Sequence, residues 1–329
     1  MNKDYYIFKS GRMRRKNNTF YFIDEENNKR SLPVHQMENI YVFGSVDFNT
    51  EFLNLLTKHE VRLHFYNYYG FYNGTYYPRS KKVSGFTVVN QSSHYLAKDR
   101  RGYLAKQFVY SSAFHMMRNL RNYKKYEEVK SVIESMQLNL DSLENVNRVP
   151  EIMGVEGTLR QLYYSSFNYF LPDEFAFDER TKRPPKDPLN ALISFGNSMC
   201  YTAVLTEIYK THLDPTVSFL HEPSTKRFSL SLDIAEIFKP LLVDSVIFAL
   251  LNRKQIKISD FEFLEEMVIL NDSGKKKFIK EWNEKLGTTI RHRRLKRNVS
   301  YKYFIRLECY KLIKHFIGDK KYKPLKAWW

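Results

Sequence analysis

The stretch that decides the fold is LSLDIAEIFKPLLVDSVIFALL, from Leu230 to Leu251, which is dense in apolar residues at helical spacing. Within it Asp233 and Glu236 stand three residues apart, so a helix projects both carboxylates from one face. Two interpretations follow: a solvated charged face, or half of a divalent metal site. Like charges on one face repel unless a cation lies between them. The apolar surroundings favour the metal site, since both carboxylates must be accommodated within a mostly apolar helix. Pro240 cannot donate a hydrogen bond to the carbonyl of residue 236, so we expect a distortion there that helps to aim Glu236.

Helical patterns also precede and follow this stretch, at residues 94–123, 123–144, 152–170, 188–212 and from 256 to the C-terminus. From residue 5 to 77, in contrast, short aromatic and β-branched runs alternate with Asn-rich or charged turns, which predicts strands, with one helix at 51–60. The hydrophobic period changes near residue 85. The sequence therefore predicts an α+β fold, with a small N-terminal antiparallel β domain (1–85, the expected dimerisation unit) followed by a larger all-α catalytic domain (86–329).

The composition narrows the class of protein. The 329 residues include 43% hydrophobic residues, which excludes disordered and fibrous classes. Lys and Arg number 53 against 36 Asp and Glu, a net charge of +17 that points to a polyanionic partner. A solvated basic surface is the alternative. Neither G-x-G-x-x-G nor the nucleotide-binding P-loop pattern occurs, which disfavours NAD and ATP chemistry.

The two cysteines, Cys200 and Cys309, are too far apart in sequence to form a C-x-x-C redox or zinc pair. A reducing compartment is the simplest context for them. The N-terminus lacks the apolar core of a signal peptide, and the longest apolar stretch is interrupted by Asp244. We therefore expect a cytoplasmic protein without a membrane partner.

The positive charge is concentrated near the C-terminus. Residues 291–326 hold 13 Lys and Arg against two acidic residues, and so contribute +11 of the +17. Aromatic residues alternate with the bases, and we interpret them as the buried face of terminal helices. The cluster RHRRLKR is the expected site of phosphate contact. Its candidate DNA-binding residues are Arg291, Arg293, Arg294 and Arg297.

Two further positions could carry chemistry. Glu156 lies by an amphipathic helix, where the alternative is a carboxylate at a helix start that favours the helix dipole. His221 stands between an apolar run and Pro223, and a lone histidine is usually structural. The chain shows no G-x-S-x-G and no H-E-x-x-H pattern, which leaves serine hydrolase and zincin chemistry without support. Acidic residues in a basic protein suit metal-assisted phosphoryl transfer.

Taken together, these segments resemble the CRISPR-associated adaptation integrase family, CRISPR-associated protein one. The motifs that carry the resemblance are Glu156-Gly157 with the following Arg160 and Tyr163-Tyr164, the RPPKDPLNALISFGNSM stretch (183–199), Phe219-Leu220-His221-Glu222-Pro223, and the segment from Arg227 to Asp244. The chain looks similar to the type I branch, with subtype I-B as the expected subtype. The resemblance implies a β domain before a helical domain. It also implies that Glu156, His221 and Glu236 are metal ligands and that Asp233 is a supporting acidic residue of the catalytic site.

What the resemblance implies about activity is DNA integration. Such proteins join the 3′-OH of a prespacer to a CRISPR repeat by transesterification, using Mg²⁺ or Mn²⁺. They bind double-stranded DNA, form homodimers, and assemble with a small dimeric partner, CRISPR-associated protein two. Carried onto this chain, Arg160, Arg227 and Lys239 join the basic cluster as expected DNA-backbone contacts. The competing hypotheses are a stand-alone metal-dependent nuclease in repair and a non-catalytic basic DNA-binding protein.

Overall fold

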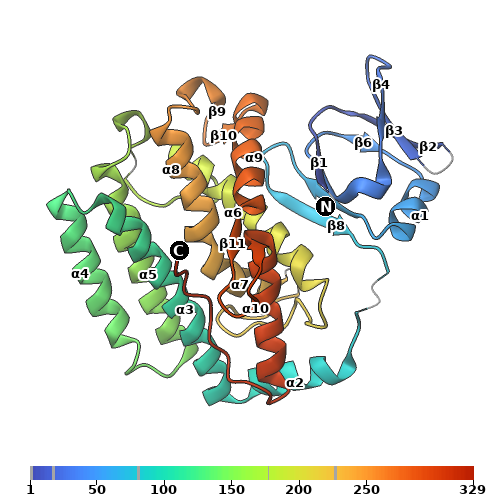
Figure 1. Ribbon diagram of the computed structural model, residues 1–329. Helices are drawn as coiled ribbons and strands as arrows, with labels where there is room; N and C mark the ends of the chain where they lie inside the picture. The colour runs from blue at the N-terminus through green and yellow to red at the C-terminus, as the bar shows by residue number, and fades with distance from the viewer. Residues whose placement is uncertain (1–2, 17–18, 80–81, 177, 226–227) are drawn as a thin grey trace. The chain divides into compact units, whose positions relative to one another are not determined.

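The computed structural model describes residues 3–16, 19–79, 82–176, 178–225 and 228–329. The chain divides into two compact units, Met1–Lys81 and Lys82–Trp329, a few residues before the period change expected at 85. A β-sheet unit precedes a mainly helical one (Figure 1), so the predicted α+β fold class is confirmed.

The N-terminal unit contains two four-stranded sheets. Its strands are β1 Lys3–Ile7, β2 Gly11–Lys16, β3 Thr19–Asp24, β4 Lys29–Leu32, β5 Met37–Val42, β6 Val46–Asp47, β7 Arg62–Tyr66 and β8 Tyr72–Tyr76, and its helices are a 3₁₀ turn at Val34–Gln36 and α1 Thr50–Lys58. The strand orders are β1-β5-β7-β8 and β4-β3-β2-β6. The predicted helix in this unit is confirmed, since Asn49 caps α1 and Phe52, Leu55 and Leu56 are buried on it.

The strand pairing differs from the purely antiparallel arrangement that we expected. β1 pairs with β5, β5 with β7, and β2 with β6 in parallel, while the remaining pairs are antiparallel. The reason is the connections: α1 lies between β5 and β7, and three strands lie between β1 and β5, which is enough chain to return in the same direction. The sheets are therefore mixed.

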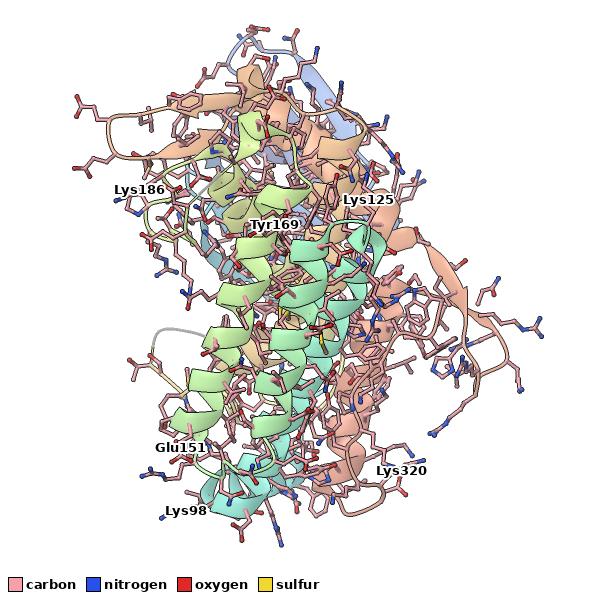
Figure 2. All side chains as sticks on the ribbon, turned by 90° about the vertical axis from the view of Figure 1, so that its left-hand side faces the viewer. Lys98, Lys125, Glu151, Tyr169, Lys186 and Lys320 are labelled. Atoms are coloured by element: carbon pink, nitrogen blue, oxygen red, sulfur yellow. The ribbon has the colours of Figure 1, made fainter. Side chains whose placement is uncertain are left out.

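The C-terminal unit is built mainly from helices. They are α2 Gly85–Leu96, α3 Lys98–Leu120, α4 Glu127–Ser142, α5 Val149–Ser165, α6 Pro188–Ile208, α7 Ser229–Phe238, α8 Ser245–Asn252, α9 Asp272–Gly287 and α10 Tyr301–Phe316, with 3₁₀ turns at Arg121–Tyr123, Ser166–Tyr169, Asp173–Phe175 and Ile258–Asp260. Helix α3 packs against α2, α4, α5 and α7. Figure 2 shows α4 and α5 side by side, with Glu151 at the first turn of α5 and Tyr169 just beyond its end. The described part of this unit has no helix long and apolar enough to cross a membrane.

Helix α6 forms the centre of this unit. Asp187 caps it by accepting a hydrogen bond from the Asn190 backbone N–H at 2.8 Å, and nearly all its side chains are buried. Gly196 lets two neighbours approach closely, because a Cβ there would lie 2.4 Å from Val243 and 2.8 Å from Phe278. The segment that follows α7 is therefore held tightly against α6.

That segment, Lys239–Asp244, is a π-helical turn between α7 and α8. Pro240 is its second residue, so the chain cannot continue as a regular α-helix through this position. The distortion predicted at Pro240 is confirmed.

Two short hairpins interrupt the helices, so the expectation of an all-α domain is wrong in this respect. Strands β9 Phe261–Phe263 and β10 Val268–Leu270 pair antiparallel, as do β11 Thr289–Arg291 and β12 Asn298–Ser300. The strands are three residues long, too short to show alternation. The RHRRLKR cluster (291–297) forms the end of β11 and the turn of the β11–β12 hairpin. This hairpin projects from the right of the view in Figure 2 with nitrogen-tipped side chains.

Candidate active site

Helices α5 and α7 bring two of the predicted residues to one place through a shared arginine. Glu156 lies in the middle of α5 rather than at a helix start, and Arg160 follows it by one turn. The Arg160 guanidinium forms ion pairs with both Glu156 and Glu236 of α7. The side chain of Arg160 is only 17% exposed, and that of Glu236 only 4%. Arg160 therefore links carboxylates that are 80 residues apart in the sequence.

Glu236 has a second cationic neighbour. Lys239, three residues later at the start of the π-helical turn, donates to Glu236 Oε1 at 2.7 Å, and its side chain is 7% exposed. The other oxygen, Oε2, contacts Arg160 Nη2. Both oxygens of Glu236 therefore lie against a cationic side chain.

Asp233 organises the loop that carries His221. One of its oxygens accepts the backbone N–H groups of Phe219 and Leu220, at 2.6 and 3.0 Å. The other accepts the His221 backbone N–H at 2.9 Å and lies 2.8 Å from His221 Nδ1. Asp233 is fully buried, and its oxygens are occupied by these four contacts. It supports His221 instead of offering a free ligand oxygen.

The contact with Asp233 fixes the chemistry of the imidazole. An ionised carboxylate only accepts, so Nδ1 carries the hydrogen, and in the neutral form of the ring Nε2 keeps its lone pair. Nε2 lies 4.0 Å from Glu236 Oε1. Two ligand atoms that each lie about 2.1 Å from one metal ion can be separated by such a distance. A carboxylate–histidine pair with one free ring nitrogen is the usual arrangement at metal centres.

The outer side of the His221 loop is held by α3. Arg101 Nε donates to the Phe219 carbonyl at 3.0 Å, and Arg101 Nη2 contacts Glu222 at 2.5 Å. Tyr95 of α2 also donates to Glu222, and the Arg101 guanidinium stacks over its ring. The loop is therefore held by Asp233 and also by Arg101 and Tyr95.

The electrostatics of the site depend on burial and on cations. Burial alone would raise the pKa of Glu156, but Arg160 and Lys239 outweigh it and the pKa lies below its usual value. Burial lowers the pKa of Lys182, and the nearby charges of Arg160, Arg180 and Lys239 lower it further. Arg160 and Lys239 thus pair with the two glutamates, and Arg180 and Lys182 add positive charge near Arg160, which suits a phosphate group.

Arg180 and Lys182 are site residues that the sequence reasoning missed. Arg180 donates to Asn190 Oδ1 at 2.7 Å and to Ser194 Oγ at 2.9 Å, which anchors the segment before α6. The signal that could have revealed them is the density of four bases in RTKRPPK (180–186).

A buried carboxyl group lies behind the site. Asp244, the last residue of the π-helical turn, accepts a hydrogen bond from the Tyr163 hydroxyl at 3.0 Å. Burial raises the pKa of Asp244 to about 7, although Tyr163, Arg160 and Lys239 act in the opposite direction. This carboxyl group titrates close to neutral pH.

The structure places the expected DNA contacts in three different situations. Arg160 and Lys239 are buried in ion pairs within the site. The four arginines of the β11–β12 hairpin are exposed: Arg291, Arg293, Arg294 and Arg297. Arg227 lies outside the described residues.

Within the described residues, no group of three or more His, Cys, Asp or Glu side chains is arranged to hold a metal ion. The donor set nevertheless suits Mg²⁺ or Mn²⁺, because Glu156 and Glu236 supply hard oxygens and His221 a neutral nitrogen. The Arg160 guanidinium and the Lys239 ammonium supply the positive charge between the carboxylates.

The site in the helical unit combines acidic residues, an oriented histidine and several cations, a set that suits an enzyme acting on phosphodiesters. A family model described as CRISPR associated protein Cas1 matches residues 5–284. The CRISPR-associated endonuclease Cas1 of Clostridium perfringens is 55% identical over 332 residues, which cover all of both chains. The chain therefore belongs to the Cas1 family of CRISPR-associated endonucleases.

Solved structures agree with this assignment. A Cas1 protein from Thermotoga maritima has a TM-score of 0.89 at 38% identity, covering 99% of this chain and 100% of that one. Two more distant chains share the fold. A casposase bound to an integration product has a TM-score of 0.86 at 23% identity, covering 98% and 92%. A chain of a Cas6-RT-Cas1–Cas2 complex has a TM-score of 0.84 at 17% identity, covering 99% of this chain and 36% of that one.

Proposed function

We propose that this Cas1 protein is a metal-dependent integrase that inserts prespacer DNA into a CRISPR repeat array by transesterification. The observation that carries the proposal is the His221 geometry: Asp233 holds Nδ1, and Nε2 faces Glu236 at 4.0 Å. In a member of the Cas1 family, this geometry is best explained as one side of a metal site that includes Glu156.

The proposed reaction exchanges one phosphodiester bond for another. The oxygen of the prespacer 3′-OH forms a bond to phosphorus at the repeat boundary, and the bond from phosphorus to the departing ester oxygen breaks. The attacking hydroxyl loses its proton and the departing oxygen gains one, so no oxidant or nucleotide cofactor is needed. When bound, Mg²⁺ or Mn²⁺ supplies Lewis-acid stabilisation of the phosphate and favours loss of the hydroxyl proton.

The residues of this chain prepare that step. Glu156 stays ionised at neutral pH because its pKa is lowered. Asp233 holds Nδ1 of His221 and so orients the ring. Arg160 and Lys239 balance the glutamates in a buried place where unpaired anions would be costly. Lys182 and Arg180 add positive charge that favours the approach of a DNA phosphate.

We assign DNA binding to the exposed β11–β12 hairpin. Its arginines lie on a narrow projecting turn, and two of them are partly ordered by aromatic rings: Arg293 lies over Trp328, and Arg297 donates to the Tyr303 hydroxyl at 3.0 Å. Such exposed guanidinium groups can neutralise phosphates and release counterions.

Assembly is part of the proposal. We expect a homodimer that binds the small dimeric CRISPR-associated protein two. A chain of similar fold is part of a Cas6-RT-Cas1–Cas2 complex. The proposed assignment to type I, subtype I-B, rests on the sequence motifs, and the genes beside the repeat array would test it. Light scattering of the protein alone and with the partner tests the assembly.

A strand-transfer assay tests the reaction itself. The protein and its small partner are incubated with a prespacer, a repeat-containing plasmid and Mn²⁺. Joined strands that disappear on adding EDTA support the proposal. Nicks without joining indicate a stand-alone nuclease, and DNA binding without either product indicates a non-catalytic DNA-binding protein.

A further inference from the structure

The last residues of the chain run along α3. In Figure 1 the C-terminal segment (red) passes beside this helix, and we call residues Tyr322–Trp329 the strap. Tyr103 donates to the Tyr322 carbonyl at 2.6 Å, and Ser111 donates to the Leu325 carbonyl at 2.5 Å. Tyr322, Leu325 and Ala327 are buried. The strap is therefore docked in a fixed register on α3.

One buried histidine joins the strap to the catalytic helix. His115 of α3 has no exposed surface, and its Nδ1 lies 3.1 Å from the Ile237 carbonyl of α7. Its Nε2 accepts the Ala327 backbone N–H at 3.0 Å. A carbonyl can only accept and an N–H can only donate, so these contacts assign the neutral ring with its hydrogen on Nδ1. Burial lowers the pKa of His115 to about 3, which keeps this link neutral at all working pH values.

The bonded carbonyl directly follows a proposed ligand. Ile237 is the next residue after Glu236, at the point where α7 gives way to the π-helical turn. One helical turn beyond His115, Asn119 donates to the Pro240 carbonyl at 2.8 Å and to the Tyr163 hydroxyl at 3.0 Å. Helix α3 thus holds backbone carbonyls on both sides of Lys239.

We propose that the strap positions Glu236 through His115, so that the last residues of the chain help to build the proposed metal site of α5 and α7. The inference rests on the proposed role of Glu236. His115 is a positioning residue, because it acts through the Ile237 backbone and touches none of the proposed ligands. The strap fixes the ring of His115, and the ring fixes the end of α7.

The sharpest test removes the strap hydrogen bond without touching α3. Ala327→Pro eliminates the N–H that His115 accepts. Lys323→Pro, at an exposed strap position, is the matched control for a stiffened chain. His115→Phe keeps a buried ring and removes both hydrogen bonds. Single-turnover strand transfer is measured at saturating DNA over a range of Mn²⁺ concentrations, with thermal melting and DNA affinity measured on the same samples.

The expected result is a loss of about 10- to 100-fold in rate, in Mn²⁺ affinity or in both for Ala327→Pro and His115→Phe, the range for residues that orient metal ligands. DNA affinity should stay unchanged, and Lys323→Pro should behave as the wild type. A folded Ala327→Pro protein with wild-type rate and Mn²⁺ dependence overturns the inference. If Glu236→Gln retains activity, the proposed metal site itself fails. If Glu236→Gln is inactive while Ala327→Pro is normal, only the role of the strap fails.

Discussion

The arginines of the active site and those of the β11–β12 hairpin carry the same charge in opposite surroundings. Arg160 is 17% exposed and lies between two glutamates. The hairpin arginines are exposed, and aromatic rings are the partners of two of them. A buried charge is held in one geometry by the cost of leaving it unpaired, whereas an exposed one is free to meet DNA. In the proposed function, burial therefore separates the cations that would shape the chemistry from those that would hold the DNA.

The largest effect should come from the oriented histidine. His221→Ala removes the proposed nitrogen ligand and should lower the strand-transfer rate more than about 100-fold, beyond the range for residues that only orient ligands. Its DNA affinity should change less than about twofold, since the hairpin is intact. His212→Ala, a surface histidine outside the site, is the control. Near-normal strand transfer by His221→Ala would remove the distinction between the two regions.

A smaller loss is expected for the residue that holds the loop. Asp233→Asn keeps the shape but weakens four contacts to backbone and imidazole, so the rate should fall about 10- to 100-fold. The free energy of unfolding should fall by about 1.5–3 kcal/mol, because charge-assisted hydrogen bonds are lost. Asp319→Asn, in an exposed ion pair, should leave both quantities unchanged. Denaturant titration and strand-transfer rates measure the two effects.

The buried carboxyl of Asp244 makes stability depend on pH. Its folded-state pKa of about 7 exceeds the unfolded value of 3.8, so the folded state holds a proton that the unfolded state releases. Stability from this group is fully present below pH 3.8 and is lost as the pH rises to about 7. The loss is on the order of 4 kcal/mol at most. Asp244→Asn should gain stability relative to the wild type between pH 5 and pH 8, as measured by denaturant unfolding. A constant difference across these pH values would contradict the assignment.

The smallest effect is expected from a single hairpin arginine. Arg294→Ala should weaken DNA binding a few-fold and reduce the slope of log affinity against log salt by about 0.9. The unfolding free energy should change by less than about 0.5 kcal/mol, as for ordinary surface substitutions. Arg294→Lys, which keeps the charge, is the matched control. The DNA affinity of each variant is measured from low to moderate salt. An unchanged slope of log affinity against log salt would exclude a phosphate contact at this position.

Much of the fold was predictable from periodicity. The apolar face of α1 and the helical spacing around Leu230 to Leu251 gave the correct element types, and Pro240 gave the position of the distortion. The partners of the strands were not predictable, because alternation shows which face is buried and not which strand lies alongside. The three-residue strands of the two hairpins carry too little pattern to be recognised.

The sequence carries more local signal for the acidic residues of the candidate site than for the basic ones. The spacing of Asp233 and Glu236 indicated a shared face, yet the structure gives them different tasks, since Asp233 binds the loop at 219–221. Arg160 and Lys239 stand four and three residues after a glutamate, a spacing that already favours ion pairs. His115 gave no local signal, because its partners are more than 100 residues away in the sequence.

The most direct test of these separate roles for the buried site and the hairpin arginines compares two variants in one assay. Glu236→Gln removes a charge from the buried site, and a quadruple alanine variant removes the four hairpin arginines. The rate of single-turnover strand transfer is measured at saturating DNA in Mn²⁺, and DNA affinity is measured on the same samples. For Glu236→Gln we predict that the strand-transfer rate is lost while DNA affinity stays normal. The hairpin variant should show weakened affinity with a near-normal rate once DNA is saturating. The reverse pattern, or equal losses of rate and affinity in both variants, would contradict the account.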